Sequence, residues 1–185
     1  TFNKVLLLKP DYAEAHNNKG ATFIDQGKLD EAIKAFNKAL SLKPNYAEAY
    51  NNVGTIFQNQ GKLDEAIETY NKALALKPDY AEAYNNIGLT FQNKGKFDEA
   101  LDAYKKALSL RPNYADVYNN IGNIYKNKGE LTEAIETFDR ALAFKPDYAE
   151  AYNNKGASFI DQGKLGEAID AFNKAFSLKP DYADA

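Results

Sequence analysis

Residues 47–80 read AEAYNNVGTIFQNQGKLDEAIETYNKALALKPDY, and this stretch decides the fold because close copies of it fill the chain. Proline recurs every 34 residues, at positions 10, 44, 78, 112, 146 and 180, and a tyrosine follows two residues after each one. Internal repetition at this period is typical of solenoid proteins. We therefore expect one array over 1–185, with the end of a partial repeat at 1–12, five full repeats at 13–46, 47–80, 81–114, 115–148 and 149–182, and the start of a further repeat at 183–185.

The apolar spacing inside each repeat is helical. Tyr50, Val53 and Phe57 lie three and four residues apart, which places them on one face of a first helix. A second such pattern runs from Leu63 to the residues before Pro78, because proline cannot continue a helix. A pair of helices cannot bury both of its faces alone, so neighbouring pairs must stack. The sequence predicts an all-α solenoid of antiparallel helix pairs.

Glycines and acids mark the details of each pair. A glycine within a helix costs about 1 kcal/mol relative to alanine, so we expect Gly54 to permit close approach to the alanines of the second helix. Gly61 fits a left-handed residue that ends the first helix. Asp79 and Glu82 have the spacing of a capping box, and the paired acids at 30–31, 64–65 and 98–99 fit helix starts. Gly166 interrupts this acidic pattern and predicts the weakest start of a second helix.

Composition excludes several classes of function. The 185 residues carry a net charge of −3, and the pI of about 5.3 is far from that of a typical nucleic-acid-binding domain. No apolar run is long enough to cross a membrane, and the chain has no cysteine for disulfides or thiolate metal sites. We expect no membrane partner and a cytoplasmic location. The missing methionine suggests that the sequence is a fragment.

The sequence offers no catalytic group and no cofactor site. His16 is the single histidine, and it replaces the tyrosine found at 50, 84, 118 and 152. No phosphate-binding glycine loop, dinucleotide fingerprint or nucleophile elbow is present. We therefore expect a protein that is not an enzyme and that binds neither a metal nor a cofactor.

One polar stripe of the first helix is unexplained by packing, and it contains two adjacent asparagines in every repeat. Asparagine is a mediocre helix former, but its amide offers both a donor and an acceptor to the backbone of an extended peptide. We predict a peptide-binding groove formed by Asn17, Asn18, Asn51, Asn52, Asn85, Asn86, Asn119, Asn120, Asn153, Asn154, Gln58, Gln92, Asn123, Lys126, Ile24 and Ile160. Which asparagine of each pair faces the groove stays open, because one of them could bond to the adjacent repeat instead.

The positions of Tyr50, Gly54, Ala66, Tyr70 and Pro78 resemble the tetratricopeptide repeat, with tyrosine where the usual motif has tryptophan. The resemblance covers the whole chain, and it implies a right-handed superhelical solenoid whose first helices line a concave protein-binding surface. The repeats are most similar to those in the superhelical arm of O-linked N-acetylglucosamine transferases. That resemblance implies a ladder formed by the second asparagine of each pair. Carboxylate-clamp members use Lys and Arg on this stripe, so their function is not expected here.

Three functional hypotheses follow from these features. The first is a non-catalytic scaffold that binds a peptide or a partner helix in the asparagine-rich groove. The second is the substrate-recognition arm of a larger enzyme, such as a glycosyltransferase. The third is end-to-end self-association, because the chain begins with apolar Phe2, Val5 and Leu6 and ends where a further helix would start.

The repeats at 13–46 and 149–182 are more alike than adjacent ones, and they carry Ile24 and Ile160 where the others have Gln or Lys. The groove should therefore alternate between polar and apolar lining. Irregular substitutions such as Phe144 argue against a designed consensus array.

Overall fold

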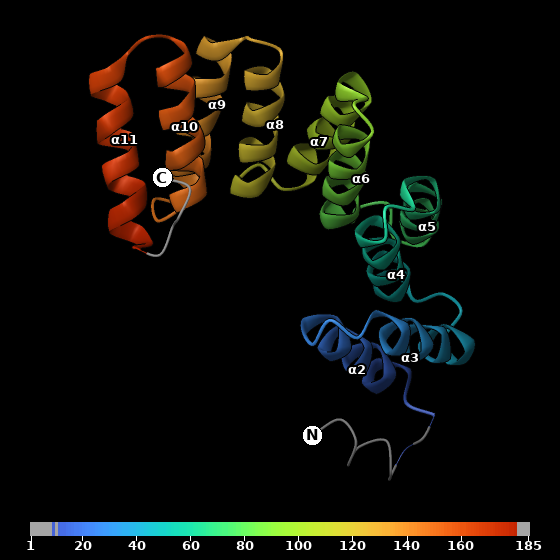
Figure 1. The fold of residues 1–185 in the computed structure, drawn as a ribbon. Helices are drawn as coiled ribbons and strands as arrows, with labels where there is room; N and C mark the ends of the chain where they lie inside the picture. Colours follow the sequence, from blue (N-terminus) through green and yellow to red (C-terminus); the bar gives the residue numbers. More distant parts are fainter. Residues whose placement is uncertain (1–8, 10, 181–185) are drawn as a thin grey trace. The chain divides into compact units, whose positions relative to one another are not determined.

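The computed structural model describes residues 9 and 11–180, and within them the chain is entirely α-helical outside its loops. The predicted ends of the array, including Phe2, Val5, Leu6 and residues 183–185, lie outside the described residues. The helices come in pairs (Figure 1): α2 (Ala13–Asp25) and α3 (Leu29–Leu42), α4 (Ala47–Asn59) and α5 (Leu63–Leu76), α6 (Ala81–Asn93) and α7 (Phe97–Leu110), α8 (Ala115–Asn127) and α9 (Leu131–Phe144), α10 (Ala149–Asp161) and α11 (Leu165–Leu178). The predicted all-α repeat solenoid is confirmed.

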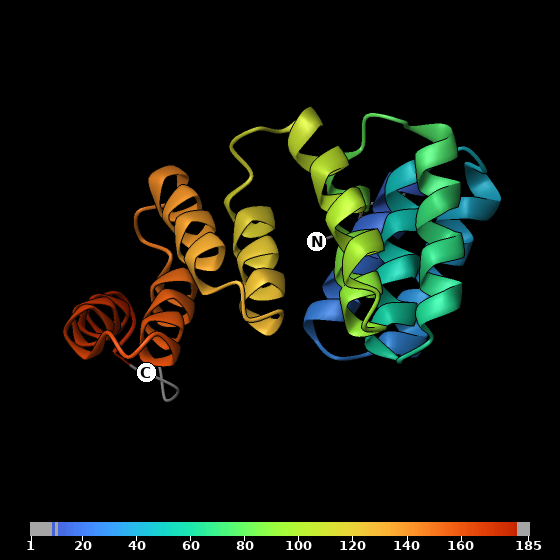
Figure 2. The same cartoon turned by 90° about the horizontal axis from the view of Figure 1, so that it is seen from above.

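The chain forms two compact units, residues 1–103 and 104–185, and the boundary falls inside α7. In the first unit α2 packs on α3 and α4 on α5, while α3 contacts α4 and α5 contacts α6 (Figure 2). In the second unit α8 packs on α9 and α10 on α11, and α9 contacts α10. The first helices of successive repeats also touch, as α2 does α4, α4 does α6, and α8 does α10.

The glycines have the two roles that the sequence predicted. The loop glycines at 27, 61, 95, 129 and 163 all have positive φ, which a residue with a side chain rarely adopts. Gly54 lies at a close approach within the pair, and the atoms nearest to an added Cβ belong to the ring of Tyr70. A Cβ added at Gly54 would lie 2.6 Å from Cε1 of Tyr70. The helices approach closely so that a buried aromatic ring can lie against bare backbone.

The predicted capping box at Asp79 and Glu82 is wrong. Helix α6 begins at Ala81 with Tyr80 as its N-cap, and no side chain caps it. Asp79 contributes only its backbone, whose carbonyl accepts from the Ala81 amide at 3.1 Å. The acid in the first turn of a first helix forms an ion pair instead of a cap. Glu14 of α2 pairs with Lys43 at 2.9 Å, and Glu48 of α4 pairs with Lys77 at 3.6 Å. These two ion pairs connect the start of the first and second full repeats to the loop that ends each of them.

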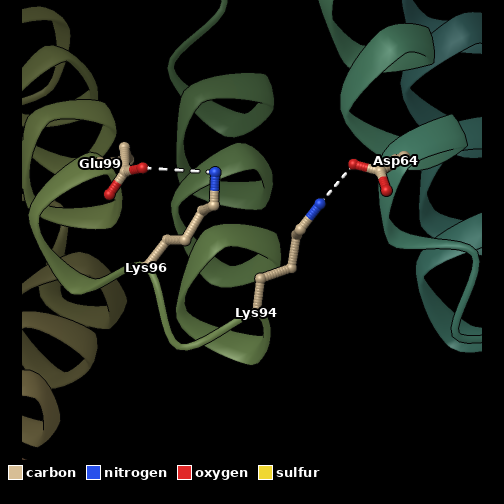
Figure 3. A network of polar contacts seen from close by, with 4 residues as sticks. All are labelled: Asp64, Lys94, Lys96 and Glu99. Carbon is tan, nitrogen blue, oxygen red and sulfur yellow. Dashed lines mark hydrogen bonds and ion pairs between the residues drawn. The ribbon is translucent and has the colours of Figure 1, made fainter.

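The paired acids do lie in the first turns of the second helices, as predicted. Asp64 has a further partner, because Lys94 of the following repeat donates to its carboxylate (Figure 3). This hydrogen bond and the positive charge hold the pKa of Asp64 below its usual value. Lys96 pairs within its own helix start, with Glu99 at 3.5 Å. Position 64 therefore connects two successive repeats, which the sequence reasoning missed.

Candidate functional site

The two asparagines of each pair lie in different environments on the first helix of each repeat. Asn17, Asn51 and Asn119 are buried, and Asn85 and Asn153 are half-buried. The second asparagines are more accessible: Asn52, Asn86, Asn120 and Asn154 are half-buried, and Asn18 is exposed. The first member of the pair therefore belongs to the contact between helices, and the second lies nearer the surface.

Hydrogen bonds join the second asparagine of one repeat to the first asparagine of the repeat before it. Asn52 Nδ2 donates to Asn17 Oδ1 at 3.1 Å. Asn86 Nδ2 donates to Asn51 Oδ1, and Asn154 Nδ2 to Asn119 Oδ1, each at 3.0 Å. Each bond spans 35 residues. These bonds form what we call the asparagine ladder, which runs along α2, α4 and α6 in the first unit and along α8 and α10 in the second.

The ladder fixes the amide groups on both sides. A buried amide oxygen needs a donor, and each buried first asparagine obtains one from the following repeat. The Nδ2 of the donor carries two protons, and the ladder bond uses one of them. Each second asparagine in the ladder therefore has an Oδ1 and one N–H outside the ladder bond, and the Oδ1 of Asn86 accepts from Asn85 Nδ2 at 3.5 Å. Both asparagines of a pair thus take part in contacts between repeats. The sequence indicated such a contact as an alternative for only one of the two.

Other residues of the predicted stripe also make contacts within the protein. The Tyr70 hydroxyl donates to Gln58 Oε1 at 2.9 Å and lies 3.3 Å from Thr55 Oγ1. Burial raises the pKa of Tyr70 to about 12, so the hydroxyl remains a donor at neutral pH. Ile24 was predicted to line the groove, and its side chain packs beside the hydrophobic cluster that includes Ala32 and Phe36.

A pattern in the sequence could have revealed these contacts. Glutamine occurs at 58 and 92, in the two repeats whose second helix carries Tyr70 and Tyr104. Isoleucine occurs at 24 and 160, in two repeats that have Phe36 and Phe172 at the same place. A buried hydroxyl needs a polar partner and a phenyl ring does not. The contacts shown are those of Gln58 with Tyr70 and of Ile24 beside Phe36, whereas the Tyr104 hydroxyl has a hydrogen bond with Asn120. The repeat at 115–148 departs from the sequence pattern by combining lysine at 126 with phenylalanine at 138.

The remaining stripe residues differ in accessibility. Asn123 and Lys126 on α8 are half-buried, and Ile160 on α10 is 46% exposed. The acidic residues that open the stripe are paired with groups of their own repeat or a neighbouring one. Lys43 holds the pKa of Glu14 below its usual value by a hydrogen bond, and Asn119 Nδ2 donates to Glu150 Oε1 at 3.0 Å. Lys43 therefore offsets the charge of Glu14, whereas Glu150 keeps its negative charge because the amide of Asn119 is neutral.

Two equivalent cavities lie elsewhere, between the helices of the first and fifth full repeats. A cavity of about 330 Å³ is lined by His16, Lys19, Phe23, Glu31, Lys34, Ala35 and Lys38. One of about 280 Å³ is lined by Tyr152, Lys155, Phe159, Glu167, Asp170 and Ala171. Both include the lysine that replaces a core Val or Ile. Lys155 Nζ lies 2.6 Å from Asp139 Oδ1, so the positive charge of Lys155 is paired with a carboxylate of the preceding repeat.

Among residues 9 and 11–180, no group of three His, Cys, Asp or Glu side chains is placed to hold a metal ion. In the same part of the chain, no helix combines the length and the apolar character that crossing a membrane requires.

Comparison with known proteins places these repeats in a family. Models of the TPR repeat match residues 20–61, 54–95, 93–129 and 122–160, and a model of the tetratricopeptide repeat matches 149–182. No curated protein sequence matches the chain significantly.

Solved structures share the fold over most of their length. The crystal structure of MamA is 31% identical, with a TM-score of 0.72, and the match covers 90% of this chain and 97% of that one. YrrB, described as a TPR protein with an unusual peptide-binding site, is 23% identical with a TM-score of 0.67 over 100% and 95% of the two chains. TTC0263, described as a thermophilic TPR protein in Thermus thermophilus, is 24% identical with a TM-score of 0.79 over 94% of each chain. The 34-residue period, the ring-against-glycine packing and the matched family models together show that this chain belongs to the tetratricopeptide repeat family.

Proposed function

We propose that the chain is a non-catalytic scaffold that binds an extended peptide along the first helices of its repeats, through the second asparagine of each pair. The asparagine ladder carries this proposal. It holds Asn52, Asn86 and Asn154 by one N–H each, which fixes the orientation of the amides before a ligand arrives. Groups that are oriented in advance lose less conformational freedom on binding.

The chemistry suits a peptide backbone better than a particular side chain. Each oriented amide has one N–H donor and one carbonyl acceptor outside the ladder bond. An extended peptide presents its own backbone N–H and C=O groups at regular intervals, and both can pair with such amides. Because the amides recur once per repeat, affinity would build up along the ligand with limited dependence on its sequence.

The family supports binding of a protein or peptide. Tetratricopeptide repeat proteins serve as interaction scaffolds, and YrrB is described as having a peptide-binding site. The predicted groove residues Gln58, Gln92, Asn123, Lys126, Ile24 and Ile160 would tune the lining between the amides in this proposal. The scaffold would act in the cytoplasm, with no role in binding nucleic acid.

Panning a library of random twelve-residue peptides against the whole chain tests the proposal. The test variant carries Asn52→Ala and Asn86→Ala, which removes two second asparagines from the first unit. The matched control carries Asn59→Ala and Asn93→Ala, which removes two exposed asparagines from the C-terminal ends of the same helices. Selected peptides should bind the wild type and the control and lose about tenfold or more in affinity for the test variant.

A further variant separates ligand binding from the integrity of the ladder. Asn51→Asp retains an oxygen acceptor for Asn86 Nδ2 and leaves the second asparagines unchanged, so it should still bind the selected peptides. Circular dichroism must show that each variant remains helical. Equal binding by the wild type and the Asn52→Ala/Asn86→Ala variant would refute the asparagine groove.

Two other functions are proposed as alternatives. In the first, the chain is the substrate-recognition arm of a larger enzyme, as the resemblance to the arm of O-linked N-acetylglucosamine transferases implies. A glycosyltransferase assay on the full gene product, with and without residues 1–185, tests that role. The second is self-association through an end of the array. It is favoured by the apolar side chains of α11, where Leu165 is 62%, Ile169 59% and Phe176 56% exposed.

A further inference from the structure

The cavity between α10 and α11 exists where a lysine replaces a core residue. At the same position of the third full repeat, Ile87 packs in one cluster with Ala103 of its own second helix. Lys155 extends away from this position instead, because its Nζ pairs with Asp139 of α9. The branched side chain of Ile87 therefore has no counterpart beside Ala171, and a cavity of about 280 Å³ lies there.

The cavity belongs to the junction of the fifth repeat with the repeat before it. In the third repeat the corresponding junction is closed by Ala66 and Tyr70 of α5, which cluster with Ile87. In the fifth repeat α9 has the place of α5, since α9 contacts α10 and carries the partner of Lys155. The cavity thus lies on the side of α10 that faces α9.

Two carboxylates at the cavity carry charge that no described residue offsets. Glu167 and Asp170 of α11 line it, and neither forms an ion pair with another described residue. The residue of α5 that corresponds to Asp170 is Glu68, and it pairs with Lys72 at 2.8 Å. Because the charge of Lys155 is offset by its own ion pair with α9, the cavity as a whole is negative.

The accessibility of these carboxylates is usual for their positions in a repeat. In α5 the corresponding residues, Glu65 and Glu68, are exposed although α6 contacts that helix. Glu167 and Asp170 are exposed in the same way. A charged group of a ligand can therefore approach the cavity without displacing a helix.

Aromatic side chains form further walls of the cavity. The ring centroid of Phe159 lies 5.5 Å from Lys155 Nζ and 5.9 Å from Lys164 Nζ, so this ring already has cations beside it. The half-buried ring of Tyr152 also lines the cavity, and no cation of the described residues lies over it. A cation that enters the cavity would be attracted both by this ring and by the carboxylates.

We propose that this cavity binds an arginine side chain of a partner protein, with the guanidinium donating to Glu167 and Asp170 and lying against Tyr152. A guanidinium is planar, presents several N–H donors to carboxylates and stacks on aromatic rings, whereas the ammonium group of lysine is a compact point charge. Pockets for drug-sized ligands measure about 300–1,000 Å³, so a cavity of about 280 Å³ suits a single side chain. The asparagine ladder takes no part in this site, which goes beyond the proposed function by adding a second contact surface.

Nuclear magnetic resonance of the ¹⁵N-labelled chain tests the proposal, with the peptide acetyl-Gly-Gly-Arg-Gly-Gly-amide as the probe. The peptide should cause saturable shifts of backbone amides around the cavity. The same peptide with citrulline, which has nearly the same shape but no charge, should cause none, and the peptide with lysine should bind several-fold more weakly. The variant Glu167→Gln/Asp170→Asn keeps the shape of both side chains and should weaken binding at least about tenfold. The matched control Glu65→Gln/Glu68→Gln removes the same charges from α5 and should bind like the wild type.

A further variant, Lys155→Ile, separates binding in the cavity from attraction to a negative surface. It introduces the residue of the third repeat, which should fill the cavity, and it also makes the chain more negative by one charge. Binding in the cavity should therefore be lost, whereas general attraction between charges would become stronger. Circular dichroism and the melting temperature verify that every variant folds.

Each outcome either supports the site or overturns it. Loss of binding in both Glu167→Gln/Asp170→Asn and Lys155→Ile supports an arginine site in the cavity. Binding that persists or strengthens in Lys155→Ile, or equal binding of the lysine peptide, would overturn it in favour of attraction to surface charge. A wild type that shows no saturable shift would overturn it as well. None of these results bears on the asparagine groove, whose test uses Asn52→Ala and Asn86→Ala in the first unit.

Discussion

The packing of an aromatic ring against a glycine predicts that Gly→Ala destabilises the protein, although alanine has the higher helix propensity. Gly122 lies within α8, and a Cβ built there would be 2.5 Å from Cε1 and 2.7 Å from Cδ1 of Phe138. Phe138 is fully buried on α9, so its ring has little room to move. In a solvent-exposed helix the change Gly→Ala would stabilise by about 1 kcal/mol. Here the ring or the helix must shift, and overpacking of this kind costs about 1–3 kcal/mol.

We therefore expect Gly122→Ala to lower the free energy of unfolding by up to about 2 kcal/mol, despite the gain in propensity. Urea denaturation followed by circular dichroism measures the change. Because repeat arrays unfold in steps, the loss should appear in the transition of the second unit. Phe138→Leu in the same chain should relieve the contact, so a double-mutant cycle should show a coupling of at least about 0.5 kcal/mol. Stabilisation by Gly122→Ala alone would refute the packing argument.

Three further outcomes follow from the same contacts. Gly166→Ala should stabilise the helix by a few tenths of a kcal/mol up to about 1 kcal/mol in thermal melts, because nothing lies within 4 Å of its added Cβ; destabilisation would contradict this. Asn119→Ala should lower the free energy of unfolding by about 1–3 kcal/mol, because Asn154 loses its acceptor, and unchanged urea denaturation would count against the ladder. Tyr70 should ionise near its pKa of about 12 in an ultraviolet titration, well above an unfolded tyrosine near 10. Its contribution to stability is then complete below about pH 10 and is lost as the pH rises through the folded pKa, whereas Tyr70→Phe should remove that dependence.

The repeat architecture could be predicted from the sequence because it depends on local and periodic features. Glycine at 61 and proline at 78 end helices through backbone geometry alone, without reference to distant residues. The two helices of a pair are joined by a short loop, so their antiparallel packing follows from connectivity. The period of 34 residues then predicts that each pair packs on its neighbours in a repeating way.

Side-chain partners were harder to predict, because several chemically reasonable contacts compete. Asp79 could have capped α6, but the chain turns so that Tyr80 is the N-cap and Asp79 contributes its carbonyl. Asp64 was explained by the helix dipole alone, although Lys94 of the next repeat also reaches it. Such contacts depend on the rotation between successive pairs, which periodicity does not specify.

The asparagine pair shows the same division between what the pattern predicts and what geometry adds. Its recurrence predicted a shared role, but the direction of the bond from Asn52 back to Asn17 required coordinates. Gln58 was predicted to line the groove, and the Tyr70 hydroxyl donates to it. The rule that a buried hydroxyl needs a partner would have linked the two from sequence, since glutamine occurs in the repeats that carry tyrosine.

Nuclear magnetic resonance of the side-chain amides tests the central claim most directly. In a chain labelled with ¹⁵N-asparagine, assigned by single Asn→Asp substitutions, Asn52, Asn86 and Asn154 should each show one N–H protected by the ladder and one that exchanges with water. Addition of a peptide selected by panning should shift the exchanging N–H and leave the protected one in place. Peptide binding that shifts no second-asparagine amide, or equal exchange of both N–H groups in the free chain, would contradict the account.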